Sequence, residues 1–142
     1  FNDAIIFGYR DYLEKGINIL DIDFDFLILP GWVAQQLPKN IVDVFVNIRS
    51  MMEMNKENID FYFDSIQTSL KVGGIFTCFN RYEKIVGNFI NKFINYPFDN
   101  DWKSLMSHSS AFQPHIHQLI LKRMKKNSGS DFKESLRKIQ QK

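Results

Sequence analysis

The sequence contains a single cysteine, Cys78, in 142 residues. One thiol excludes an intrachain disulfide framework and every zinc motif built from several cysteines. Cys78 lies in the apolar run IFTCF, which predicts a small buried core residue, with a catalytic nucleophile as the alternative reading. The near absence of cysteine therefore favours a reduced, cytoplasmic setting.

Long apolar runs are also missing. No segment reaches the roughly 20 apolar residues that a membrane-spanning helix needs, and no signal peptide is visible. The formal net charge is only +2, too small to predict binding to nucleic acid. Six of the 18 Lys and Arg residues fall within residues 125–142, a segment that we predict to be a basic C-terminal helix or tail.

Aromatic residues, in contrast, are abundant. The chain has 14 Phe and 5 Tyr, and hydrophobic residues make up 44% of it. This composition is typical of one globular domain whose core is filled by large flat side chains. The first residue is Phe1 rather than Met, from which we expect the chain to be a piece of a longer protein.

The spacing of apolar residues predicts alternating helices and strands. In chain order these are a helix over 3–15, a strand over 24–29, a connector over 31–40, a strand over 42–48, a helix that begins at Asn55 and ends at Gly73, a strand over 75–79, a helix over 82–94, strands over 102–107 and 115–123, and a helix from about Ser130 with Phe132, Leu136 and Ile139 inward.

This order predicts an α/β fold. Strands alternating with helices favour a mainly parallel, Rossmann-like sheet with helices on both faces. The last two strands are separated only by the polar loop HSSAFQP, so we expect an antiparallel hairpin at the C-terminal end of the sheet.

Three motifs resemble a known family. Leu70-Lys71-x-Gly73-Gly74 before an apolar strand is similar to the element that opens the fifth strand of class I S-adenosylmethionine-dependent methyltransferases. The segments NIRSMMEM and CFNRYEK resemble, more narrowly, sugar O-methyltransferases of bacterial surface-polysaccharide gene clusters. The similarity runs over residues 24–124. It implies S-adenosylmethionine as the cofactor and a sugar or glycoconjugate as the substrate.

The same resemblance shows what the chain lacks. The family binds the methionine part of the cofactor with a Gly-rich loop after its first strand, but Gly-x-Gly occurs nowhere in this sequence. Residues 24–29, 42–48 and 75–79 correspond to the third, fourth and fifth strands. Residues 1–124 are therefore expected to be the C-terminal part of an incomplete class I methyltransferase fold. It would be active only if an N-terminal segment were supplied.

The resemblance places cofactor residues after two strands. Leu29, Pro30 and Trp32 would border the adenine, and Asn47 would contact cofactor or substrate. The alternative is structural: Pro30 begins an ordinary turn, Trp32 packs on the core, and Asn47 satisfies backbone groups in its loop.

Two residues are candidates for the base that removes a hydroxyl proton during O-methylation. Glu53 follows the fourth strand, although it could instead cap the next helix. His108 lies on the predicted hairpin, where the alternative is a partly exposed strand histidine with no catalytic role. His115 and His117 would share one face of a strand, as a metal site can require, but no third ligand is evident and we assign no metal.

Substrate contacts are expected where the fourth and fifth strands end. Sugars are bound by amides, guanidinium groups and aromatic rings, a requirement that four polar residues fit: Arg49, Ser50, Asn80 and Arg81. Arg81 could equally pair with Glu83 or Asp99 on the surface.

Three hypotheses follow for function. The leading one is an S-adenosylmethionine-dependent sugar O-methyltransferase, of which this chain is a fragment. The second is a non-catalytic α/β module whose exposed apolar surface is covered by a partner, such as a second copy. The third is another enzyme of similar architecture that modifies nucleotide sugars and has its phosphate loop upstream.

Overall fold

The computed structural model describes residues 3–15, 23–125 and 136. The chain divides into two compact units, Phe1–Pro38 and Lys39–Lys142, which are described separately. No helix within the described ranges is long and apolar enough to cross a membrane.

The first unit is built on a pair of very short strands. Strand β1 (Ile6–Phe7) pairs in parallel with β2 (Phe26–Leu27). Helix α1 (Tyr9–Lys15) follows β1, and a 3₁₀ helix, η2 (Gly31–Gln36), follows β2. The predicted connector with one helical turn is thus confirmed.

Two predictions for this unit are wrong in extent. The helix expected from residue 3 begins only at Tyr9, because Ile5 donates its backbone N–H to the Asp25 carboxylate and Ile6 enters the strand pair. The strand expected over 24–29 has only two residues. It pairs with β1, so it is not a strand of the main sheet described below. Apolar neighbours such as Ile5 and Ile6 suit either type of structure.

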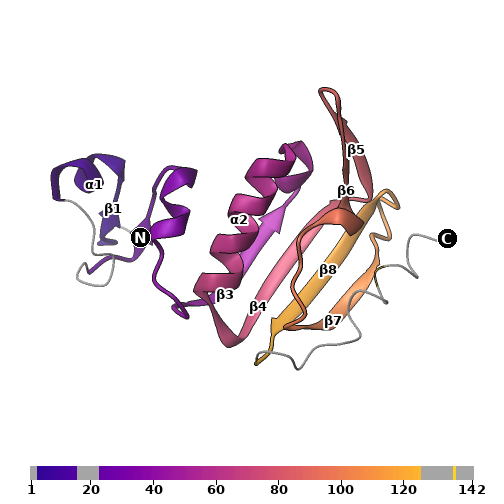
Figure 1. Cartoon of the computed structure of the whole chain (residues 1–142). Helices are drawn as coiled ribbons and strands as arrows, with labels where there is room; N and C mark the ends of the chain where they lie inside the picture. The colour runs from indigo at the N-terminus through magenta and orange to yellow at the C-terminus, as the bar shows by residue number, and fades with distance from the viewer. Residues whose placement is uncertain (1–2, 16–22, 126–135, 137–142) are drawn as a thin grey trace. The chain divides into compact units, whose positions relative to one another are not determined.

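The second unit contains a four-stranded mixed sheet. Its elements are β3 (Val42–Ile48), the 3₁₀ helix η3 (Met51–Glu53), α2 (Lys56–Ser69), β4 (Leu70–Arg81), β5 (Glu83–Val86), β6 (Phe89–Lys92), the 3₁₀ helix η4 (Phe93–Asn95), β7 (Trp102–Ser109) and β8 (Ile116–Arg123). The strand order is β3-β4-β8-β7 (Figure 1).

The α/β class and the C-terminal antiparallel hairpin are confirmed, but a mainly parallel sheet is not. In the four-stranded sheet β3 and β4 are parallel, whereas β8 is antiparallel to both β4 and β7. The predicted helix between the fifth strand and the hairpin is absent, as described below. The chain passes from β4 to β7 by way of the β5–β6 hairpin, and β8 then folds back between β7 and β4 and is antiparallel to both.

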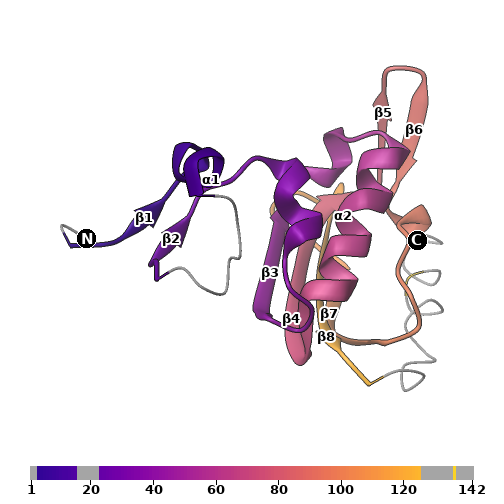
Figure 2. The same cartoon turned by 60° about the vertical axis from the view of Figure 1, so that its left-hand side comes forward.

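Helix α2 lies along one face of the sheet in both views (Figures 1 and 2). Asn55 caps its N-terminus, as predicted, by accepting a hydrogen bond from the Asn58 N–H at 2.9 Å. The buried side chains Ile59, Phe63 and Ile66 face the sheet. At the other end, the Thr68 and Ser69 carbonyls accept hydrogen bonds from Asn40 and Ile41, directly before β3.

Helices do not cover the opposite face of this sheet within the described residues. Val44, Val46 and Ile48 of β3 are each 56% exposed there. The prediction of helices on both faces is therefore wrong for the described part of the chain.

Aromatic side chains fill the core between α2 and the sheet, as the composition predicts. Phe63 contacts Phe76, Tyr96 and Phe98 with ring centroids 4.7–5.9 Å apart. Leu136 is helical and joins this core. The rest of the predicted C-terminal helix, with Phe132 and Ile139, lies outside the described residues.

Gly73 and Gly74 lie inside a strand rather than at a helix end. Helix α2 stops at Ser69 and β4 begins with the next residue. Val42 faces Leu70 but Val44 faces Ile75, so the register shifts at the two glycines. Gly73 has φ +90°, which L side chains rarely adopt. The glycines thus form a bulge in β4, and the predicted helix stop at Gly73 is wrong.

The bulge yields a stability prediction for Gly74→Ala. A Cβ at this position would lie 2.9 Å from the Lys71 carbonyl oxygen and 3.0 Å from that of Asp43. Both are backbone atoms of paired strands, so we expect the free energy of unfolding in urea to fall by about 2–3 kcal/mol.

Gly87→Ala is the matched control. Gly87 has φ +60°, but no atom lies within 4 Å of the place that a Cβ would take there. The substitution should cost only the backbone penalty, about 1 kcal/mol. A Gly74→Ala effect no larger than that of Gly87→Ala would contradict the steric explanation.

A β-hairpin replaces the helix predicted over 82–94. Strands β5 and β6 are antiparallel, with Val86 opposite Phe89 and Gly87-Asn88 as the two-residue loop. Gly87 has φ +60°, as such tight turns require. The run EKIV–FINK fits a period of two as well as helical spacing, and the Gly-Asn pair is the signal that decides for the hairpin.

Candidate functional site

Polar residues gather at one end of the four-stranded sheet. The parallel strands β3 and β4 end side by side, with Ile48 opposite Phe79. Strand β8 begins at the same end of the sheet and β7 terminates there, with His108 opposite Gln118. In open α/β sheets ligands bind where parallel strands end, so this end of the sheet is the candidate site.

Two buried asparagines connect the strand ends. The Asn80 amide donates to the Asn47 side-chain oxygen at 2.9 Å, and its own oxygen accepts from the Met52 N–H at 3.1 Å. Asn47 also donates to the Ser50 hydroxyl. Asn80 is 0% exposed, so in this structure it positions the loop after β3 and does not reach solvent.

Cys78 lies beneath these amides. It is fully buried, as predicted for a core residue. Burial raises the pKa of its thiol to about 12, and the hydrogen bond from Asn80 offsets only part of this shift. Because the thiolate is the nucleophilic form, Cys78 is inert near neutral pH.

The two arginines of the site differ in conformation and burial. Arg49 is exposed and has φ +63°, a strained value for a residue other than glycine. Its N–H donates to the Phe79 carbonyl at 2.8 Å. Arg81 is partly buried, and its Nε has no hydrogen-bond partner among the described residues. Glu83 and Asp99, its predicted alternative partners, pair with Lys92 and Arg123 instead.

The two candidate bases lie at this end of the sheet, on different elements. Glu53 ends η3, where its half-exposed carboxylate pairs with Lys84. His108 is exposed near the end of β7, and its Nδ1 lies 2.8 Å from the Ser109 carbonyl oxygen. A carbonyl only accepts, so Nδ1 carries the hydrogen and Nε2 of the neutral ring keeps a free lone pair.

A histidine–tyrosine cluster was not predicted as part of the site. His117 is fully buried, with Nδ1 3.1 Å from the Tyr82 hydroxyl and Nε2 3.1 Å from the Ser107 hydroxyl. Tyr82 continues the chain of contacts to Ser109 at 2.7 Å. The spacing of His117 two residues after His115 suggested a metal pair, but His115 is exposed and precedes β8. No metal-binding group of three His, Cys, Asp or Glu side chains occurs among the described residues.

The His117 cluster predicts a pH dependence of stability. Burial, with a smaller contribution from nearby His108, lowers the pKa of His117 to about 4. Between about pH 6.5 and pH 4 the unfolded chain therefore binds a proton at this residue that the native chain does not, and stability falls as the pH falls. Relative to His117→Gln, the wild type should lose on the order of 2 kcal/mol between about pH 7 and pH 5.

Urea unfolding at the two pH values measures this difference. His115→Gln removes an exposed histidine instead and should keep the wild-type pH dependence. If the free energy of unfolding depends on pH equally in the wild type and in His117→Gln, His117 is not held neutral by burial.

The predicted adenine-binding residues belong to the first unit. Leu29 and Pro30 are partly buried. Trp32 is 65% exposed and meets Tyr9 edge to face, with centroids 6.0 Å apart. Its indole does not fill a core, in contrast to the structural alternative.

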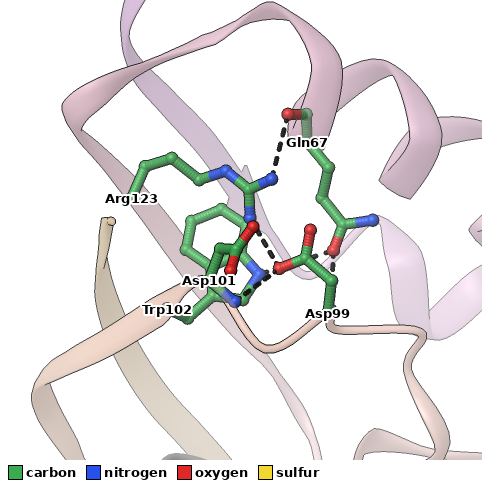
Figure 3. Close-up of polar contacts among 5 residues, drawn as sticks. All are labelled: Gln67, Asp99, Asp101, Trp102 and Arg123. Carbon is green, nitrogen blue, oxygen red and sulfur yellow. Dashed lines mark hydrogen bonds and ion pairs between the residues drawn. The ribbon is translucent and has the colours of Figure 1, made fainter. Parts of the chain in front are cut away.

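A second polar cluster lies at the opposite end of the sheet, where Trp102 at the start of β7 faces Arg123 at the end of β8 (Figure 3). Arg123 binds the Asp99 carboxylate at 2.6 Å and the Gln67 carbonyl at 3.3 Å, and its guanidinium stacks 4.7 Å from the Trp102 ring. Its contacts join α2, the loop before β7 and the end of β8. These contacts between separate elements indicate a structural role for the cluster.

Comparisons with known proteins give only distant matches. No protein-family model matches the chain, and no curated protein sequence matches it. Among solved structures, it is similar to a candidate type 11 methyltransferase from Sulfolobus solfataricus, with 14% identity, a TM-score of 0.47, and 89% of this chain and 74% of that one covered. It is also similar to the PH0226 protein from Pyrococcus horikoshii OT3, with 9% identity, a TM-score of 0.47, and 84% and 71% covered. Likeness at this level assigns no function.

Proposed function

We propose that the chain is part of an S-adenosylmethionine-dependent O-methyltransferase that acts on a sugar of a surface polysaccharide or glycoconjugate. The observation that carries this proposal is the meeting of polar residues at the carboxyl ends of β3 and β4, where an α/β sheet binds its ligands. The motifs NIRSMMEM and CFNRYEK, which supply those residues, support the methyltransferase reading by resemblance.

The residues present do not complete a site for the cofactor. The exposed indole of Trp32 offers a flat apolar surface suited to adenine, whereas Leu29 and Pro30 are partly buried. Asn47 is engaged with Ser50 and Asn80 and would have to exchange the Ser50 contact to bind a cofactor. Gly-x-Gly is absent from the sequence, so nothing here corresponds to a loop for the methionine part.

On the acceptor side, three residues could bind sugar hydroxyls. Arg49 and Ser50 are exposed, and the Nε–H of Arg81 lacks an acceptor among the described residues. That atom is buried, so a sugar hydroxyl could accept from it only after the Arg81 side chain moves. Asn80 would contribute indirectly, by holding the loop that carries Ser50.

Of the two candidate bases, His108 has the more suitable arrangement. O-methylation needs a group with a free lone pair to take the proton of the hydroxyl. The Nε2 of His108 is free for this, whereas the Glu53 carboxylate is paired with Lys84. His108 is therefore proposed as the base and Glu53 as the alternative.

The test compares two proteins by calorimetric titration with S-adenosylhomocysteine. One is the present chain, and the other is the product of the same gene extended by whatever precedes Phe1. We expect no tight binding to the present chain and micromolar binding to a longer product that contains a Gly-rich loop. If no such longer product exists, or if it fails to bind, the proposal is wrong.

In an active longer product, His108→Ala should lower kcat for sugar methylation by about 100-fold or more. His115→Ala, which removes another exposed histidine of the same β7–β8 hairpin, is the control and should leave kcat unchanged. If Glu53→Gln and not His108→Ala has the large effect, Glu53 is the base.

A second candidate function is a non-catalytic interaction module. The exposed apolar side chains of β3 and the absence of Gly-x-Gly favour it. Failure of every available gene product to bind S-adenosylhomocysteine, together with stable self-association, would support this function over catalysis.

A further inference from the structure

Strand β3 forms an unprotected edge of the four-stranded sheet. It pairs with β4 on one side, and none of the described residues pairs with its other side. From Val44 to Ile48 the sequence VFVNI has no charge and no proline. Proteins usually protect edge strands with charged residues or proline, because the unpaired N–H and C=O groups of an open edge can pair with another strand.

The backbone of β3 is oriented for strand addition. Ile48 faces Phe79, while the N–H of the next residue, Arg49, donates to the Phe79 carbonyl. In a parallel pair, every second residue of a strand directs both its N–H and its C=O to the same neighbouring strand. Asn47 and Arg49 therefore bond to β4, and the N–H and C=O groups of Val44, Val46 and Ile48 point to the open edge.

The strand is complementary to itself in one antiparallel register. If two copies of β3 pair around Val46, Val46 lies opposite Val46 of the other copy, and Val44 lies opposite Ile48. These are the residues with outward-pointing backbone groups, so each pair can exchange two hydrogen bonds. Their side chains, 56% exposed in each copy, would form β-branched cross-strand pairs on one face.

Charge complementarity supports the same register. Asp43 and Arg49 flank the apolar segment at equal distances from Val46, so each Asp43 lies opposite the Arg49 of the other copy. The Asp43 side chain is 76% exposed, and its carboxylate forms an ion pair with Lys71 at 2.7 Å. A parallel pairing would instead bring like charges together, and a shift by two residues would leave both charges without a partner in the other copy.

We propose that β3 is a homodimer interface, in which two copies pair antiparallel around Val46 and join their sheets into one. Such an arrangement has closed two-fold symmetry, the commonest form of homodimer. It rests on the second candidate function, the interaction module, because further strands of a longer methyltransferase would compete with the second copy for the open side of β3.

Sedimentation velocity over a concentration series tests the proposal on the full chain. We expect the wild type to be a dimer that dissociates on dilution. Val46→Lys would place two ammonium groups opposite each other and should raise the dimer dissociation constant by about tenfold or more. Val72→Lys is the matched control, since Val72 is 57% exposed but lies on the internal strand β4.

A charge swap tests the register and remains informative if Val46→Lys does not fold. Asp43→Arg and Arg49→Asp should each weaken the dimer, and the double variant should restore it, because the two charges then face each other in reversed order. A wild type that stays monomeric throughout the series overturns the proposal, since the edge would then serve another partner or none. Equal effects of Val46→Lys and Val72→Lys, or a double variant weaker than both single ones, also overturn it.

Discussion

Replacing Phe63 by Ala should lower the free energy of unfolding by about 3–5 kcal/mol, the largest effect expected from a single substitution in this chain. Phe63 is 0% exposed and meets Phe76, Tyr96 and Phe98 edge to face. Its removal leaves a cavity between α2 and the sheet that these rigid rings cannot fill, so the full cost of the lost contacts should be observed.

Urea denaturation followed by far-UV circular dichroism measures the effect. Phe112→Ala is the matched control, because Phe112 is 97% exposed and its loss should change stability by less than about 0.5 kcal/mol. If Phe63→Ala does not fold, Phe63→Leu should still cost about 1–2 kcal/mol. A loss for Phe63→Leu as small as that of Phe112→Ala would show that the core does not centre on Phe63.

Asn80→Leu is expected to have the second largest effect, a loss of about 2–4 kcal/mol. The leucine side chain has a similar size but no hydrogen-bonding atoms. The buried Met52 N–H would lose its acceptor, and the Asn47 side chain would lose the donor that holds it at 2.9 Å. An unsatisfied buried polar group costs more than a hydrogen bond contributes, since its hydration is not recovered.

Asn58→Ala provides the comparison for this variant. Asn58 is exposed on the first turn of α2, and the cap uses only its backbone N–H. Alanine at this position should leave stability nearly unchanged or raise it slightly. An Asn80→Leu variant as stable as the wild type would mean that the loop after β3 does not depend on the Asn80 amide.

The elements that were predicted correctly are those with one clear signal. Strand β3 is a run of β-branched residues, and α2 has an N-cap at Asn55 followed by apolar residues at helical spacing. Strands β7 and β8 are separated by an obvious polar loop. In each case local preference and tertiary packing favour the same structure.

The errors occur where one pattern fits two structures. Ile85, Phe89 and Phe93 have helical spacing, but Ile85 and Phe89 also fit the two arms of a hairpin, and the turn at Gly87 decided the outcome. Gly73 could end a helix or form a bulge. The bulge was selected by the pairing of Val44 with Ile75, a contact between distant parts of the chain that no local pattern reports.

For the candidate site, sequence reasoning named residues whose roles stay predictions, and it did not give their surroundings. Asn47, Ser50 and Asn80 are joined by hydrogen bonds, which the sequence analysis did not predict. Burial could not be predicted: Asn80 is enclosed, while Arg49 is exposed. The Tyr82–His117 pair was missed because it depends on the register Asn80↔His117 between β4 and β8.

The direct passage from α2 into β4 has a consequence for the order of folding. The last carbonyls of the helix, at Thr68 and Ser69, bond to the backbone that leads into β3, and Leu70 already belongs to β4. The end of the helix therefore cannot fray without also loosening the start of both strands. We expect β3, α2 and β4 to open as one cooperative unit, with native-state amide hydrogen exchange slowest there, and the β5–β6 hairpin to exchange independently and sooner.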